Sequence, residues 1–117
     1  MLSQRLRHRI ELQERVEIIS TAGESQGFDW RTADADGALL DDVPAEVLTG
    51  PGREFRAADA KQAETAARIT LRWFSGLSPT WRVIWDGQTF DITSIDVDLT
   101  VRREYRLRCA AGVNDGA

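Results

Sequence analysis

Residues 50–74 decide the fold and read GPGREFRAADAKQAETAARITLRWF. The opening Gly50-Pro51-Gly52 is turn chemistry, and proline is tolerated near a helix start because the first helical N–H groups have no intrahelical partner. The residues that follow are mostly Ala, Arg, Lys, Gln and Glu, which are good helix formers. This composition predicts one α-helix over about residues 52–64.

The hydrophobic period changes to two at Ala67, immediately after this helix. The apolar side chains then fall on one face, and they are Ala67, Ile69, Leu71 and Trp73. Arg68, Thr70 and Arg72 alternate with them on the other face. A period of two is that of a β-strand with one face toward a core. The helix is therefore predicted to run directly into a strand.

Five further segments alternate in the same way, and they are residues 6–19, 43–48, 81–85, 89–93 and 101–109. Asp86-Gly87 lies between two of them and is a strong signal for a two-residue hairpin turn. Ile95 is out of phase with Ile92, which indicates a bulge or a strand end near Ser94. Short strands with a small core do not stay an open, flat sheet. The predicted fold is mainly β, a small six-stranded antiparallel barrel with the one helix against an opening.

Residues 20–42 show no sustained periodicity and contain Gly23, Gly27 and Gly37, which predicts a long flexible loop. Connections longer than about 12–15 residues are uncommon in compact domains unless they are functional or disordered. Aromatic residues in an acidic loop suit docking onto a partner. The candidate interface residues of this loop are Phe28, Asp29, Trp30, Asp34, Asp36, Asp41 and Asp42. The competing interpretation is a surface excursion without a function.

The composition restricts the class of protein. A chain of 117 residues, 42% of them hydrophobic, is expected to form a single domain over residues 1–117, with 110–117 as a frayed tail. A net charge of −4 argues against a protein whose main task is to neutralise nucleic-acid phosphates. No run approaches the roughly 18 apolar residues of a transmembrane helix, so no membrane partner is expected.

The sequence gives little support for a catalytic site or a metal site. The single cysteine, Cys109, and the single histidine, His8, exclude an internal disulfide and a zinc site rich in either residue. Asp96 and Asp98 are interpreted as a solvated turn, because Ca²⁺ usually takes six or more oxygen ligands. His8 is interpreted as a packed or hydrogen-bonded residue and Cys109 as a small buried hydrophobe. The sequence therefore predicts no enzyme, no catalytic residue, no cofactor and no metal.

Arginines gather on the outward faces of two predicted strands, and they are Arg68, Arg72, Arg102, Arg106 and Arg108. One interpretation is a basic strip for nucleic acid. The favoured alternative is cross-strand pairing with Glu104, Asp91 and Glu46.

The order of several short segments matches a known family. They are LRHRIELQ at 6–13, AEV at 45–47, GREF at 52–55, RITLR at 68–72, RVIWDG at 82–87, FDI at 90–92 and EYRL at 104–107. Over roughly residues 4–109 this ordered set resembles the phage head-tail joining family, the head-closure or stopper proteins of long-tailed phages.

The resemblance implies a small barrel with one helix that assembles as a ring beneath the portal and its adaptor. Such a ring closes the channel after DNA packaging and docks the tail, and the DNA passes through without sequence-specific binding. The resemblance implies that the candidate residues of the 20–42 loop act in gating the channel. It also implies that this loop would become ordered only on docking. It makes the following residues candidate subunit contacts: Arg53, Glu54, Arg68, Arg72 and Arg106.

The predicted function is that of a structural assembly protein of a phage or prophage. Its predicted partners are further copies of itself, the portal or adaptor protein and a tail-completion protein, and it would be a monomer when free. It would reside at the head–tail interface of the virion, after assembly in the host cytoplasm. The alternatives are a neighbouring tail-completion or connector ring component and, in another class, a small-barrel nucleic-acid-binding protein with salt-sensitive DNA affinity.

Overall fold

The computed structural model describes residues 2–50, 66–98 and 100–112. In these residues a short helix, α1 (Leu2–Arg5), precedes the strands β1 (His8–Ile19), β2 (Ser25–Thr32), β3 (Asp34–Ala35), β4 (Ala38–Leu39), β5 (Val43–Thr49), β6 (Ala67–Arg72), β7 (Arg82–Trp85), β8 (Gln88–Val97) and β9 (Glu104–Ala111). The helix predicted over about 52–64, and the candidate contacts Arg53 and Glu54 within it, lie outside the described residues.

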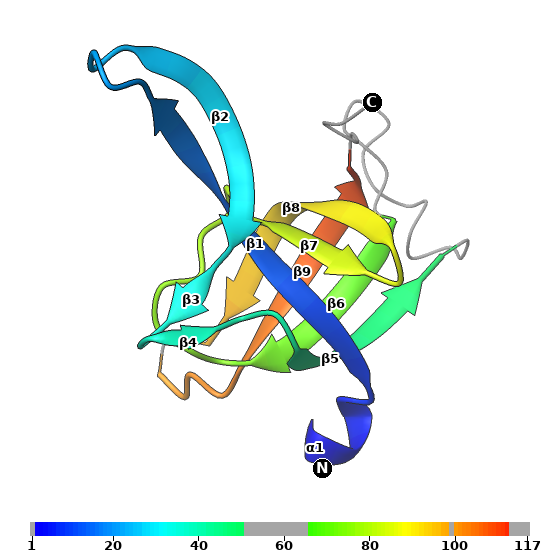
Figure 1. The fold of residues 1–117 in the computed structure, drawn as a ribbon. Helices are drawn as coiled ribbons and strands as arrows, with labels where there is room; N and C mark the ends of the chain where they lie inside the picture. Colours follow the sequence, from blue (N-terminus) through cyan, green and yellow to red (C-terminus); the bar gives the residue numbers. More distant parts are fainter. Residues whose placement is uncertain (1, 51–65, 99, 113–117) are drawn as a thin grey trace.

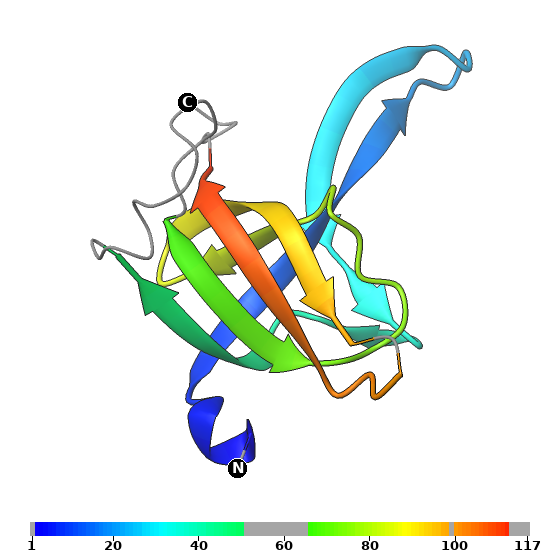
Figure 2. The ribbon, with the colours of Figure 1, turned by 180° about the vertical axis from the view of Figure 1, so that it is seen from behind.

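Six strands close into an antiparallel barrel, as the alternating segments predicted (Figure 1). The strand order is β1-β5-β6-β9-β8-β7, and pairing of β1 with β7 closes the ring of strands. In this order β9 is three strands from β1 in both directions, so the two strands lie on opposite sides of the barrel. Figure 2 shows the molecule from behind, with β9 in front and β1 at the back.

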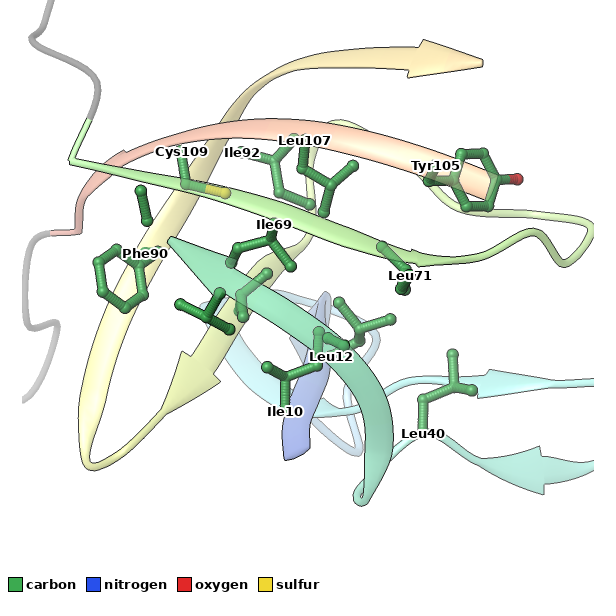
Figure 3. Packing of buried hydrophobic residues seen from close by; sticks show 14 of the residues in the cluster. Ile10, Leu12, Leu40, Ile69, Leu71, Phe90, Ile92, Tyr105, Leu107 and Cys109 are labelled. Carbon is green, nitrogen blue, oxygen red and sulfur yellow. The ribbon is translucent and has the colours of Figure 1, made fainter. Parts of the chain in front are cut away.

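The core lies inside the barrel and is built from the inward-facing residues of the barrel strands (Figure 3). Its largest fully buried side chains are Ile10, Leu12, Ile69, Leu71, Val83, Leu107 and Cys109. The prediction of one apolar face on β6 is confirmed, since Ala67, Ile69 and Leu71 are all completely buried. The barrel strands bury mainly alternate residues because successive side chains point to opposite faces of the sheet.

The hairpin predicted at Asp86-Gly87 is confirmed. Both residues have positive φ, 51° and 73°, and they join Trp85 to its register partner Gln88. Positive φ at both central residues is typical of the turn whose twist matches that of the flanking strands. The predicted irregularity near Ser94 is also present, because the register of β8 with β9 shifts between Ile92 and Ser94.

The prediction of one irregular loop over residues 20–42 was wrong. Residues 25–32 form β2, which pairs with β1, and residues 34–39 contain the small β3–β4 hairpin. The chain returns to the core between and after these strands through Ala33 and Leu40, which are both buried. The connection from β1 to the next barrel strand, β5, is long as predicted, but only short turns in it are irregular.

His8 and Cys109, which were interpreted from the sequence as structural residues, both lie in structural positions. Nδ1 of His8 accepts a hydrogen bond from the backbone N–H of Val47 at 3.1 Å, and the imidazole packs edge-on against Trp85 with 5.5 Å between ring centres. Cys109 is fully buried. Its burial, with a smaller contribution from Asp91, raises the pKa of the Cys109 thiol to about 12. Both residues belong to the barrel wall and its core.

Candidate docking surfaces

A two-stranded arm projects from the barrel (Figure 1). We define the arm as β1 from Gln13 onward, the turn at residues 20–24, and β2. Pairing runs from Gln13 opposite Thr32 to Ile19 opposite Ser25, a length of about 20 Å at the usual rise of a strand. Among the described strands, β1 beyond Gln13 pairs with β2 alone. An isolated two-stranded ribbon is marginally stable in water, so this one depends on side-chain contacts or on a partner.

Side chains at the base of the arm hold it against the barrel. Nε of Arg82, on β7, donates a hydrogen bond to Oε1 of Gln13 at 2.7 Å. The Arg82 guanidinium also lies 4.3 Å from the ring centre of Trp30, on β2. Further along the same face, the Arg15 guanidinium lies 4.1 Å from the ring centre of Phe28. The two contacts of Arg82 give the arm a defined direction relative to the barrel.

A groove of about 710 Å³ lies where the arm meets the barrel. It is lined from both sides, by Arg15, Phe28, Asp29, Trp30, Pro79, Thr80, Trp81, Arg82, Asp91 and Ile92. Three of the predicted interface residues, Phe28, Asp29 and Trp30, therefore meet in one place. Sequence analysis missed their arginine partners, Arg15 and Arg82, because they come from other strands.

The outer part of the arm exposes large apolar side chains to solvent. Ile18 is 42% exposed, Ile19 54% and Phe28 57%. Glu17 and Glu24 are exposed beside them. Within the part of the chain that the structure describes, neither of these two carboxylates forms an ion pair. Large apolar side chains exposed beside charged ones make the arm a candidate interaction surface.

The other predicted loop residues lie apart from the arm. Asp34 begins β3, and Asp36 occupies the β3–β4 turn with a φ of 52°. Asp41 and Asp42 follow β4, and Asp42 lies 3.9 Å from Arg9. The seven predicted residues therefore form two groups, three on the arm and four on the β3–β4 hairpin and the segment after it.

Four arginines form a basic surface on the outward faces of β6 and β9, and we call this surface the arginine wall: Arg68, Arg72, Arg106 and Arg108. Arg68 lies directly opposite Arg108 in the register of the two strands. Like charges in directly opposite positions destabilise a sheet. Two of the carboxylates predicted as cross-strand partners pair elsewhere: Glu104 lies 3.6 Å from Arg106 on its own strand, and Glu46 pairs with Arg5 at 3.0 Å.

A second groove, of about 320 Å³, runs over the arginine wall. Its lining residues come from five elements and are Arg5, Glu46, Leu48, Arg68, Ile69, Thr70, Asp96, Arg106, Leu107 and Arg108. Leu48 is 48% exposed and lies opposite Arg68 in the β5–β6 register. The groove therefore combines positive charge with an exposed apolar side chain.

Other kinds of site were sought in the described ranges. Residues 2–50, 66–98 and 100–112 contain no group of three or more His, Cys, Asp or Glu side chains that could hold a metal ion. Oδ1 of Asp98 accepts hydrogen bonds from the backbone N–H groups of Thr100 and Val101, as expected for a solvated turn. Asp96, predicted for the same turn, instead lies in β8 opposite Arg106. None of the helices described has the length and apolar character needed to span a bilayer.

Comparison with known proteins identifies the family. A family model described as phage head completion protein matches residues 1–112, so the chain belongs to the phage head completion protein family. The solution structure of protein SF1141 from Shigella flexneri 2a is similar in fold, with a TM-score of 0.72 and 21% identity over 98% of this chain and 100% of that one. A chain in the virion of a native gene transfer agent particle is also similar, with a TM-score of 0.59 and 21% identity over 93% and 96%. No curated protein sequence matches significantly.

Family membership confirms the resemblance to head-tail joining proteins. The chain is a structural, non-enzymatic protein of the phage particle that completes the head. A protein with that task contacts other head and tail proteins, so docking surfaces are the functional sites to expect on it.

Proposed function

We propose that this chain is a subunit of a ring at the head–tail junction that closes the portal channel after DNA packaging and docks the tail. The family supports a role in completing the head. The arm is the observation that carries the proposal, because it extends exposed apolar side chains away from a closed barrel.

The contrast between barrel and arm explains why the arm would act in assembly. A closed barrel has no strand edges, whereas the arm leaves the outer edges of β1 and β2 without a neighbouring strand in the described structure. Ile18, Ile19 and Phe28 leave apolar surface in water, and its removal from water would favour association by roughly 25 cal/mol per Å². Assembly would bury this surface, while the free protein would remain a monomer.

The acidic group on and after the β3–β4 hairpin fits the passage of DNA. Asp34, Asp36 and Asp41 are exposed on or near the β3–β4 hairpin. If this end of the subunit lines the channel, its carboxylates repel phosphate and prevent the DNA from adhering. The proposed partners are further copies of the chain, the portal or adaptor protein and a tail-completion protein. The proposed locations are the head–tail interface of the virion and, during assembly, the host cytoplasm.

The test uses DNA-filled, tailless heads that lack this protein. Added protein should make the packaged DNA resistant to nuclease and should allow tails to attach. A variant in which Asn-Gly replaces residues 16–29 joins the register partners Arg15 and Trp30 and keeps the barrel. This variant should fail in both assays, while Val101→Ser, a change at another exposed apolar residue, should succeed. Nuclease resistance with the shortened arm would contradict the proposal.

A nucleic-acid-binding protein is the second candidate, and the arginine wall is the observation that favours it. The net charge of −4 opposes it. Titration of duplex DNA at about 50 and 200 mM salt separates the two candidates, because a protein that neutralises several phosphates loses orders of magnitude in affinity over this range. We expect negligible binding at both salt concentrations.

A further inference from the structure

We propose that the arm of one subunit docks on the arginine wall of the next copy of the chain, so that the ring is held by one head-to-tail contact repeated around it. The inference rests on the proposed function and names the two surfaces that meet. It requires that these surfaces be complementary and that they face away from each other on one subunit.

The charge of the chain is divided between the two regions. The arm, residues 13–32, contains four acidic side chains and two basic ones, Arg15 and Arg31, which gives a net charge of −2. β6 and β9 together contain four arginines and one glutamate, Glu104, which gives a net charge of +3. A surface of each sign on one molecule favours association between copies, and salt screens such attraction.

The barrel places the two surfaces on opposite sides. The arm is the continuation of β1, and β9 is the strand farthest from β1 in the closed strand order. Figures 1 and 2 agree, with β1 in front in one view and β9 in front in the other. Two different surfaces that bind each other form a heterologous contact, which generates a ring when the rotation between copies closes.

The wall offers both kinds of contact that the arm needs. One row of register partners across four strands consists of Leu48, Arg68, Arg108 and Ser94. Arg68 and Arg108 lie directly opposite each other in this row and concentrate positive charge, to which a carboxylate of a second copy would be attracted. Leu48 is half exposed at the end of the same row and can receive an apolar side chain.

The arm supplies the matching groups. Glu17 and Glu24 are exposed near its outer end, beside the apolar side chains of Ile18 and Ile19. Carboxylates on arginines and one of the two isoleucines on Leu48 would bury a mixed patch of the composition that protein interfaces have. The ribbon, which is marginal by itself, would also gain a supporting surface.

A second copy fits the wall better than DNA does. Glu46, Asp96 and Glu104 interrupt the positive charge, and the exposed Leu48 has no counterpart in a phosphate backbone. A groove that tracks a nucleic-acid backbone is positively charged along its length and often has aromatic side chains on which bases stack. The described residues that line the groove include no aromatic side chain.

Charge reversal tests the contact, with ring formation on purified portal–adaptor complex as the readout. The arm variant is Glu17→Lys/Glu24→Lys, and the wall variant is Arg106→Glu/Arg108→Glu. Each should lower the yield of complete rings about tenfold or more, because like charges would then be juxtaposed across the interface. The combined variant, which exchanges the signs, should restore much of the yield. Arg103→Glu, an exposed arginine outside the wall, should form rings normally.

Circular dichroism should show that every variant is folded. If the wild type forms no ring, the proposed function falls. If the wild type forms rings and both reversed variants do as well, this inference alone falls. A combined variant whose ring yield is no higher than that of either single-surface variant would also overturn this inference. So would a wall variant that loses duplex DNA binding while its rings form normally.

Discussion

The guanidinium of Arg82 lies 4.3 Å from the ring centre of Trp30, and this contact joins the barrel to the arm. Arg82 belongs to β7, whereas Trp30 belongs to β2, a strand that has no backbone pairing with β7 among the described strands. The same guanidinium donates to Gln13 at 2.7 Å. One side chain therefore contacts both strands of the arm where they leave the barrel, and it fixes their direction.

Arg82→Ala is expected to loosen the arm and leave the barrel folded. The change removes a cation–π contact and a hydrogen bond, together about 1–2 kcal/mol. A local loss of that size speeds opening about 5–30-fold. Hydrogen exchange of the amides of residues 25–32 should show this increase, while the amides of β6 should be unchanged. Arg103→Ala is the control, and faster exchange throughout the barrel in Arg82→Ala would contradict the assignment.

Removal of the apolar end of the arm is expected to separate assembly from stability. The variant Ile18→Ser/Ile19→Ser/Phe28→Ser changes side chains that are all more than two-fifths exposed. Because surface changes usually stay within about 0.5 kcal/mol each, denaturant unfolding should shift little. Binding to the portal–adaptor complex, followed by sedimentation, should be strongly reduced. Unimpaired binding would show that the arm does not act through these residues.

The barrel core should be sensitive at the contact between β6 and β9. Ile69 and Leu107 are register partners on these strands, and both are at most 1% exposed. Leu107→Ala leaves a cavity, and we expect it to lower the free energy of unfolding by about 2–5 kcal/mol in urea denaturation. Val101→Ala, at a residue 57% exposed, should change it by less than about 0.5 kcal/mol. Similar losses in both variants would contradict the assignment of the core.

The turn between β7 and β8 should tolerate glycine at position 87 far better than any other residue. Gly87 has a φ of 73°, a conformation in which a Cβ comes too close to the following carbonyl oxygen. Gly87→Val should therefore destabilise the protein by about 1–2 kcal/mol or more in thermal unfolding. Asp86→Asn keeps a residue that adopts positive φ readily and should cost little. A neutral Gly87→Val would mean that the turn has another conformation.

The buried thiol of Cys109 should make stability fall at alkaline pH. Burial raises the pKa of Cys109 from 9.0 to about 12, so the unfolded chain loses this proton first as the pH rises. The contribution of the buried thiol to the free energy of unfolding is complete below pH 9 and is lost between about pH 9 and 12. The slope of this loss is at most about 1.4 kcal/mol per pH unit. Burial also raises the pKa of Tyr105, which acts in the same direction.

Comparison of wild type with Cys109→Ala isolates the thiol, because the contribution of Tyr105 is common to both. The difference in unfolding free energy between them should change across this alkaline window and be constant below it. A constant difference up to pH 11 would contradict the raised pKa.

Sequence alone predicted the barrel but not the arm, and burial explains the difference. The barrel strands have one face in the core, so their alternation is visible as apolar and polar residues, as in β6. β2 also alternates, with Phe28 and Trp30 on one side and Asp29 and Arg31 on the other, yet it has no buried side chain. With Gly23 before it and Gly27 within it, such a strand resembles a loop.

The candidate docking surfaces were predicted as residue types but not as arrangements. Phe28 and Trp30 were identified as docking aromatics, and the groove with Arg15 and Arg82 depends on the register of β1 with β2 and on the pairing of β1 with β7. The opposition of Arg68 and Arg108 likewise depends on strand order, which no local pattern encodes. Alternating aromatics opposite an arginine-bearing strand are the signal that could have indicated the arm.

The most direct test of the central claim is to count the copies of this protein that bind a purified portal–adaptor complex. The wild-type protein and the variant with residues 16–29 replaced by Asn-Gly would each be mixed with the complex and examined by native mass spectrometry and electron microscopy. We predict one complete ring of fixed copy number with the wild type and none with the shortened arm. A wild-type protein that stays monomeric beside the complex, or rings that form equally well without the arm, would contradict the claim.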